Sequence, residues 1–143
     1  MNLKYSYLYF QKMGLSMIHR APPGLLPDKL DSKSEDRTFR SVFGTNWNVV
    51  AEIWHLIEKN GANKNKKPIH LLWALTFLKV YSNEQSLVMM TGGATLKTFR
   101  KWVWIVLDEM SVASAIKVRI RLSFILNSHC DILSLQFYHL LHF

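Results

Sequence analysis

Cysteine is nearly absent from this chain of 143 residues: Cys130 stands alone, so an internal disulfide is impossible. That composition fits a reducing compartment. A secretory signal is also missing, because the N-terminus has no clean apolar core followed by a small-residue cleavage site. The apolar run at 69–78 is closer to the length of a core helix than to a membrane span, and Asn, Asp, Gln and His interrupt the apolar tail after Leu122. We therefore expect no membrane association.

Recognisable catalytic motifs are lacking too. The sequence shows no Ser–His–Asp arrangement, no Gly-rich phosphate loop and no paired carboxylates. Metal-ligating residue types do occur near the C-terminus, but their spacing matches no standard zinc pattern; they are His129, Cys130, Asp131, His139 and His142. We expect no catalytic residue, no metal site, no cofactor and no small-molecule substrate.

The chain is rich in positive charge. Lys and Arg number 18 against 10 Asp and Glu, which gives a net charge of +8 and favours a polyanionic partner, nucleic acid first. The charge is spread along the chain and forms no dense basic arm. A protein that is simply basic is therefore an open alternative.

The sequence divides into three parts. Residues 1–38 show no sustained period, and 21–38 are rich in Pro, Asp and Ser, so we expect a flexible N-terminal segment and linker. Residues 39–116 have helical patterning. Residues 117–143 form a divergent and poorly defined tail: it opens with the strand-like alternation of 117–124 and then loses its period, as a strand remnant or a frameshifted segment would.

Four helices are predicted within 39–116, so the fold class is mostly α, a small helical bundle. The first, 46–59, follows Thr45 as N-cap, and the second begins at Pro68 and is apolar on nearly every side, as a central buried helix would be. The third, 83–90, follows Ser82 in a capping-box pattern with Gln85. The fourth follows Thr95 as N-cap. Its apolar residues at helical spacing are Leu96, Phe99, Val103, Val106 and Met110.

The last two helices, joined through Gly92 and Gly93, have the pattern of a helix-turn-helix. The turn of about four residues, 91–94, has the usual length, and paired glycines supply the positive φ angles of a sharp turn. In such a unit the first residues of the second helix contact DNA. The candidate DNA-binding residues are Lys97, Thr98, Arg100 and Lys101. The competing interpretation is an ordinary helical corner with a solvated basic face.

Several motifs in this region resemble the N-terminal region of Harbinger/PIF-type transposases, in the DDE-endonuclease superfamily. They are Phe43-Gly44-Thr45, the "HLLWAL" core of 68–81, Gly92-Gly93 and "KTFRKWVW" at 97–104, and the resemblance covers about half the chain, 39–116. It implies a helical, helix-turn-helix-like domain that precedes a catalytic domain whose three acidic residues hold two metal ions.

The resemblance ends near Lys117, where that catalytic domain would begin. Asp131 is the sole acid after Glu109, and one carboxylate cannot hold a two-metal pair. We therefore expect a truncated, catalytically inactive, transposase-derived protein that binds DNA weakly. The location would be nuclear, with 63–67 as a candidate localisation element or simply a solvated loop, and otherwise cytoplasmic.

Two alternatives stay open. The helical domain could be a protein association module that pairs with a full-length transposase or with the Myb-like partner protein that such elements encode. Joint exposure of Trp102 and Trp104 would favour this alternative. The chain could also be a decayed reading frame with no selected function.

Overall fold

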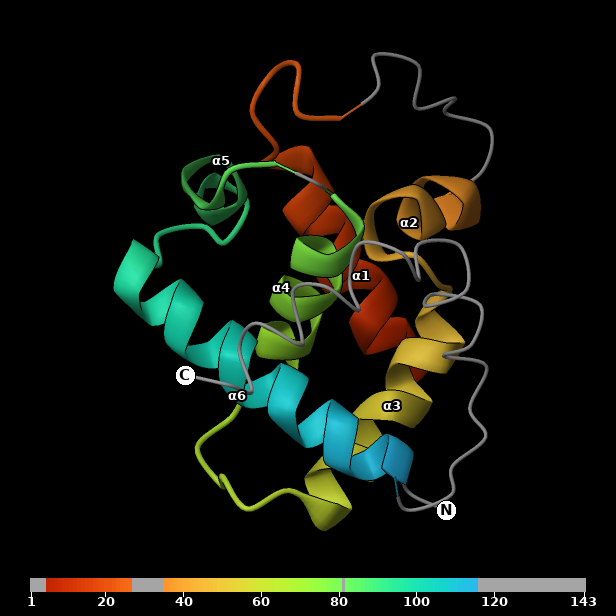
Figure 1. The fold of residues 1–143 in the computed structure, drawn as a ribbon. Helices are drawn as coiled ribbons and strands as arrows, with labels where there is room; N and C mark the ends of the chain where they lie inside the picture. The colour runs from red at the N-terminus through yellow and green to blue at the C-terminus, as the bar shows by residue number, and fades with distance from the viewer. Residues whose placement is uncertain (1–4, 27–34, 81, 116–143) are drawn as a thin grey trace.

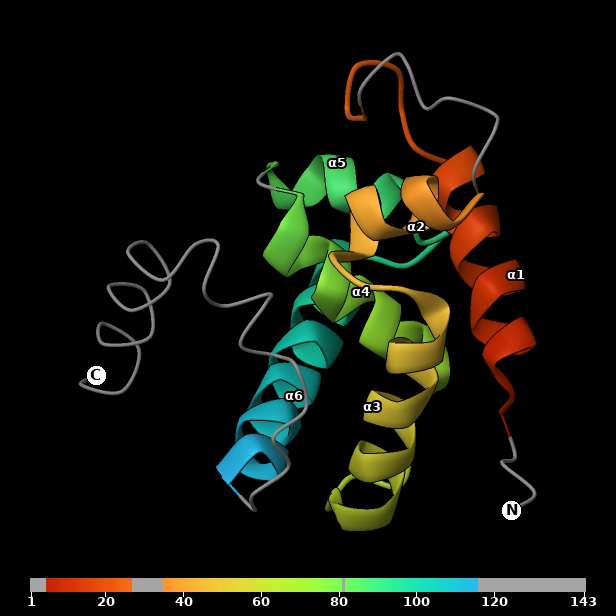
Figure 2. The same ribbon diagram turned by 90° about the vertical axis from the view of Figure 1, so that its right-hand side faces the viewer.

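The computed structural model describes residues 5–26, 35–80 and 82–115, and all the regular secondary structure in this part of the chain is α-helical (Figures 1 and 2). The predicted mostly α fold is confirmed. The predicted strand pattern and the rest of the tail, 117–143, lie outside the described residues. The six helices are α1 (Tyr7–His19), α2 (Glu35–Phe43), α3 (Trp47–Asn60), α4 (Pro68–Lys79), α5 (Glu84–Met89) and α6 (Leu96–Ala115).

Helix α4 lies at the centre of the bundle, as its sequence predicts (Figure 1). It begins at Pro68, because a proline at the first helical position gives up no intrahelical hydrogen bond. Every residue from 71 to 76 is at most 6% exposed, and each of the other five helices packs against α4. The one polar residue in this stretch, Thr76, donates its hydroxyl to the carbonyl oxygen of Leu72 at 2.8 Å. The most extensive of these helix contacts is with α6.

Helix α1 corrects the expectation of a flexible segment at 1–38. Phe10, Gly14, Met17 and Ile18 are buried, and their spacing of four, three and one places them on one helix face. A Cβ atom added to Gly14 would lie 2.2 Å from the ring of Phe39, so this glycine lets α1 and α2 cross closely. The first helix of the chain is therefore part of the core.

Helix α2 begins inside the predicted linker and corrects the domain boundary at residue 39. Glu35 and Asp36 occupy its first turn, where negative charge interacts favourably with the helix dipole. Phe39, Val42 and Phe43 are fully buried. A fragment that starts at residue 39 would cut this helix and remove α1 altogether.

Two predicted N-caps shift by one residue. Asn46, and not Thr45, caps α3 by accepting the backbone N–H of Val49 at 3.0 Å. Asn83, and not Ser82, caps α5 by accepting the N–H of Ser86 at 2.8 Å. In both cases a short amide side chain with extended backbone meets the third residue of the helix, which is the geometry that satisfies an otherwise unpaired donor.

A buried ion pair holds the loop between α3 and α4 against α6. Lys66 Nζ lies 3.1 Å from Glu109 Oε2, with the two side chains only 4% and 11% exposed. Glu109 also accepts the backbone N–H of Asn63 at 3.1 Å. The expectation that this loop is fully solvated is therefore wrong for Lys66, and Glu109 is not a surface acid. Gly61 provides the space that this ion pair needs, because a Cβ atom at residue 61 would lie 2.3 Å from Lys66 Nζ.

Among the described residues, no helix combines the length and apolarity that crossing a bilayer requires.

Candidate nucleic-acid interface

The turn between α5 and α6 has the predicted length and conformation. Gly92 and Gly93 have φ angles of +76° and +125°, which residues with a Cβ atom rarely adopt. Thr91, which the sequence did not single out, closes the turn. Its hydroxyl donates to the carbonyl oxygen of Val88 at 2.7 Å and accepts the N–H of Ala94 at 3.0 Å. The direction of α6 relative to α5 is thus set by hydrogen bonds and by two glycines.

Thr95 caps α6 as predicted. Its hydroxyl accepts the backbone N–H of Thr98 at 3.1 Å and donates to the hydroxyl of Thr98 at 2.9 Å. The hydroxyl of Thr98 is therefore already engaged in the cap. Because a hydroxyl keeps one donor and a second lone pair, Thr98 remains able to make one further polar contact, although not to reorient freely.

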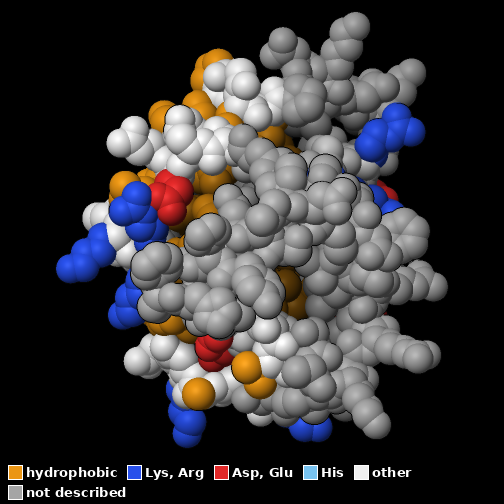
Figure 3. Space-filling model, viewed as in Figure 1, with side chains coloured by type: hydrophobic (Ala, Val, Ile, Leu, Met, Phe, Trp, Pro, Cys, Tyr) orange, Lys and Arg blue, Asp and Glu red, His pale blue; other side chains and the backbone are white. Residues whose placement is uncertain are grey.

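The apolar residues of α6 face the core. Phe99, Val103, Val106 and Met110 are at most 7% exposed, whereas Leu96 is only partly buried. Lys97 and Lys101 lie on the opposite face, and both are exposed. Figure 3 shows Lys and Arg side chains projecting from the edge of the molecule where α6 begins, with an acidic side chain beside them.

Lys97 and Lys101 form no ion pair with any described residue. The ammonium group of Lys101 lies 5.3 Å from the ring centroid of Trp102, a separation at which a cation is attracted to the ring. Both charges are therefore available to a partner from solution.

Arg100 is placed differently from the two lysines. Its Nε lies 2.5 Å from Glu84 Oε2, and this ion pair ties the start of α6 to the first turn of α5. Arg100 is exposed, but its charge is compensated by the carboxylate. The structure thus brings all four predicted residues to the first two turns of α6, with only two of them as uncompensated cations.

The two tryptophans of α6 have different environments. Trp104 is 41% exposed and meets the ring of Phe77 edge-on, with centroids 5.8 Å apart. Trp102 is partly buried and stacks on His70 at 4.1 Å, with an interplanar angle of 14°. The joint exposure that would favour protein association is therefore not observed, since only Trp104 is exposed.

His70, in the first turn of α4, packs against Trp102 of α6. Its Nδ1 accepts the backbone N–H of Lys67 at 3.0 Å, which caps α4, and its ring also contacts Trp73. Burial, with a smaller contribution from the charge of Lys67, lowers the pKa of His70 from 6.5 to about 4. The imidazole is thus neutral at pH 7 and acts as a structural group.

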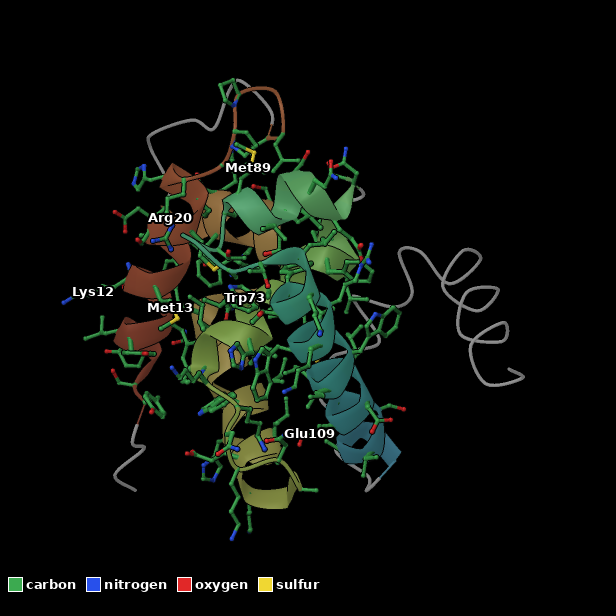
Figure 4. All side chains as sticks on the ribbon, turned by 90° about the vertical axis from the view of Figure 1, so that its left-hand side faces the viewer. Lys12, Met13, Arg20, Trp73, Met89 and Glu109 are labelled. Atoms are coloured by element: carbon green, nitrogen blue, oxygen red, sulfur yellow. The ribbon has the colours of Figure 1, made fainter. Side chains whose placement is uncertain are left out.

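Arg20 reaches the same turn from the end of α1. Its Nε donates to the carbonyl oxygen of Met90 at 3.2 Å, and Figure 4 shows the side chain beside the segment that leads into α6. Sequence reasoning missed this residue because it placed Arg20 in a flexible segment. The pattern of buried residues in α1 is the signal that could have revealed it.

The described residues contain no group of three or more His, Cys, Asp or Glu side chains able to hold a metal ion. No protein-family model, curated protein or solved structure matches the chain.

Proposed function

We propose that this protein binds duplex DNA through the helix-turn-helix formed by α5 and α6. One observation carries the proposal. Lys97 and Lys101 stand exposed and unpaired, within the described part of the chain, on the outer face of a helix that follows a tight Gly-Gly turn. Helices that enter the major groove present their N-terminal residues in this way, and lysines there contact phosphates or the acceptor groups of guanine.

The charge pattern along α6 indicates which part of the helix would contact DNA. Lys97, Lys101 and Trp104 follow one another at spacings of four and three residues on one face, and Asp108 continues that face by one more turn. A carboxylate there would repel phosphate, so contact would end near Trp104. Arg100 would act by fixing α6 on α5 through Glu84 and would contribute little to the affinity itself.

Transposase ancestry is part of the same proposal. The motifs that resemble Harbinger/PIF-type transposases include the turn and the basic start of α6, so the resembling region and the candidate interface coincide. On this proposal the protein binds DNA without cleaving it and acts in the nucleus. The loop 63–67 offers a poor localisation signal, because Lys66 is buried against Glu109.

The proposal is tested by measuring DNA binding of the full chain over a series of salt concentrations. In fluorescence anisotropy with a labelled duplex, the double variant Lys97→Gln/Lys101→Gln should bind more weakly than the parent. The slope of log K against log salt is negative, and its magnitude should decrease by about 1.8, since each lost phosphate contact removes about 0.9.

The matched control is Lys12→Gln/Lys64→Gln, which removes two exposed charges from other parts of the molecule. It should leave the slope unchanged. Equal slopes for the parent and the Lys97/Lys101 variant would show that α6 is not the binding helix. Equal losses of DNA affinity in both double variants would show that net charge alone causes the effect.

Trp104 favours a second candidate function, association with another protein. Tryptophan is a frequent anchor of protein interfaces, and here it lies with the half-buried Phe77 at the surface. A Trp104→Ser variant should then weaken capture of a full-length transposase relative in the absence of DNA, while Lys97→Gln/Lys101→Gln leaves capture intact. The reverse pattern would exclude this function.

A further inference from the structure

The guanidinium of Arg20 is fixed on the turn of the helix-turn-helix. Arg20 is the C-cap residue of α1, and the hydrogen bond from its Nε–H to the carbonyl oxygen of Met90 joins residues 70 positions apart. Met90 is itself the C-cap residue of α5. One hydrogen bond therefore attaches the first helix of the chain to the start of the turn.

Gly92 brings the same guanidinium close to the turn. A Cβ atom built on Gly92 would lie 2.9 Å from Nη1 and 3.1 Å from Cζ of Arg20. The absence of a side chain at Gly92 thus lets the guanidinium lie against the backbone, in addition to permitting the positive φ angle. Arg20 is held on two sides, by Met90 and by Gly92.

The charge of Arg20 is not compensated by a carboxylate within the described part of the chain. Other cations there are paired, among them Arg40 with Asp36, Lys66 with Glu109 and Arg100 with Glu84. Arg20 meets a neutral carbonyl instead, and the residue is exposed to solvent. Because a guanidinium carries five N–H donors and the contact with Met90 uses one, the remaining donors can bind an anion.

The place of this cation relative to α6 suggests what that anion is. The turn that Arg20 contacts leads directly into α6, as Figure 4 shows, and Lys97 lies in the first turn of that helix. When a helix enters the major groove, the segments just before it meet the sugar-phosphate backbone that borders the groove. Arginine binds phosphate with a rigid, pre-organised fork of donors, so little side-chain entropy is lost on contact.

We propose that Arg20 is a phosphate-contacting residue of the DNA interface, and that the interface therefore extends from α6 across the turn to the end of α1. This inference rests on the proposed function. It assigns to the basic surface a third uncompensated cation, which is donated by a helix outside the helix-turn-helix and is held in place before DNA arrives.

The test compares Arg20→Gln and Arg20→Lys with the parent in the same anisotropy titrations of the full chain. Arg20→Gln removes the charge but keeps an N–H donor for the carbonyl of Met90. The magnitude of its negative slope of log K against log salt should be smaller by about 0.9. The loss of affinity between 50 and 200 mM salt should therefore be about 3-fold smaller for this variant than for the parent. Arg20→Lys keeps the charge, and should keep the slope while binding more weakly.

Lys12→Gln is the matched control, because it removes one exposed charge from the same helix at a side chain that Figure 4 shows pointing away from the turn. It should leave the slope unchanged. If Arg20→Gln weakens binding equally at every salt concentration, Arg20 only positions the turn and the inference is wrong, while the proposed function stands. A parent chain without salt-dependent DNA binding would overturn both.

Discussion

The imidazole of His70 connects the start of α4 to α6. It accepts the N–H of Lys67 on one side and stacks on Trp102 on the other. Protonation would place a hydrogen on Nδ1, facing the N–H of Lys67, and would put a positive charge into a buried site. The cap of α4 therefore requires the neutral form.

Stability should consequently fall in acid. Since the pKa of His70 is lowered from 6.5 to about 4, the unfolded chain takes up a proton in this range and the folded protein does not. The free energy of unfolding should stay level above pH 6.5 and decrease as the pH falls to about 4, by on the order of 3 kcal/mol from this group. Urea unfolding at a series of pH values measures the decrease.

The variant His70→Gln should remove most of this dependence, because glutamine at the same helical position can accept the N–H of Lys67 without titrating. The exposed His19 supplies the control: His19→Gln should keep the parent's pH profile. Parallel profiles for His70→Gln and the parent would show that other groups cause the acid sensitivity.

Residue environments were the least predictable property. Lys66 and Lys97 are the same residue type, and one is buried against Glu109 while the other is exposed. Glu109 lies on α6, far along the chain from Lys66, so no local pattern relates the two. The exposed lysines of α6 could be predicted because they stand opposite an apolar stripe within the same helix.

At the scale of elements, α3, α4 and α6 could be predicted from their apolar residues, and the short α5 from its capping pattern and the glycines that follow it. The predicted starts of these four helices agree with the structure within one residue. α1 was missed because its inner face includes Gly14, which a count of apolar residues does not register, and because several neighbouring tyrosines lie outside that face. α2 was missed because the charges of its first turn resemble those of a linker.

Comparing Gly92 with Gly24 separates two reasons why the turn needs glycine: the positive φ angle and the space that the side chain of Arg20 occupies. Both have φ angles near +80°, but a Cβ atom would meet Arg20 at Gly92 and would have no atom within 4 Å at Gly24. Gly24→Ala should lower the free energy of unfolding by about 1 kcal/mol, the cost of the left-handed backbone alone. Gly92→Ala should lower it by roughly 2 kcal/mol, because the guanidinium must also move.

Denaturant unfolding measures both values, and Arg20→Ala in the Gly92→Ala background should reduce the additional loss. Equal losses at the two glycines would mean that Arg20 yields without cost, and would weaken the view that the turn holds it in place.

For the whole molecule, the main difference between prediction and structure is that the domain includes α1. Phe10 is completely buried, whereas Tyr7 on the same helix is 50% exposed. Burial of several such side chains is comparable to the net stability of a small domain, so α1 is expected to be essential for folding.

Two aromatic substitutions in α1 test this. Phe10→Ala should lower the free energy of unfolding by about 3–5 kcal/mol, the usual cost of emptying a core position. Tyr7→Ala should change it by less than about 0.5 kcal/mol, since the side chain lies at the surface. Thermal and urea unfolding of the full chain provide both values. If neither substitution changes the free energy of unfolding, the original expectation of a flexible N-terminal segment is restored.

If α6 binds DNA as proposed, its short basic stretch limits how much sequence one molecule can read. From Lys97 to Trp104 the helix rises about 10 Å, at 1.5 Å per residue, and DNA rises 3.4 Å per base pair, so the proposed contact would span roughly three base pairs. A given triplet recurs about once in every 64 positions, which is far too often to mark one site in a genome. Recognition of a single genomic site would therefore require several copies of this surface bound to one stretch of duplex, each contacting a few further base pairs.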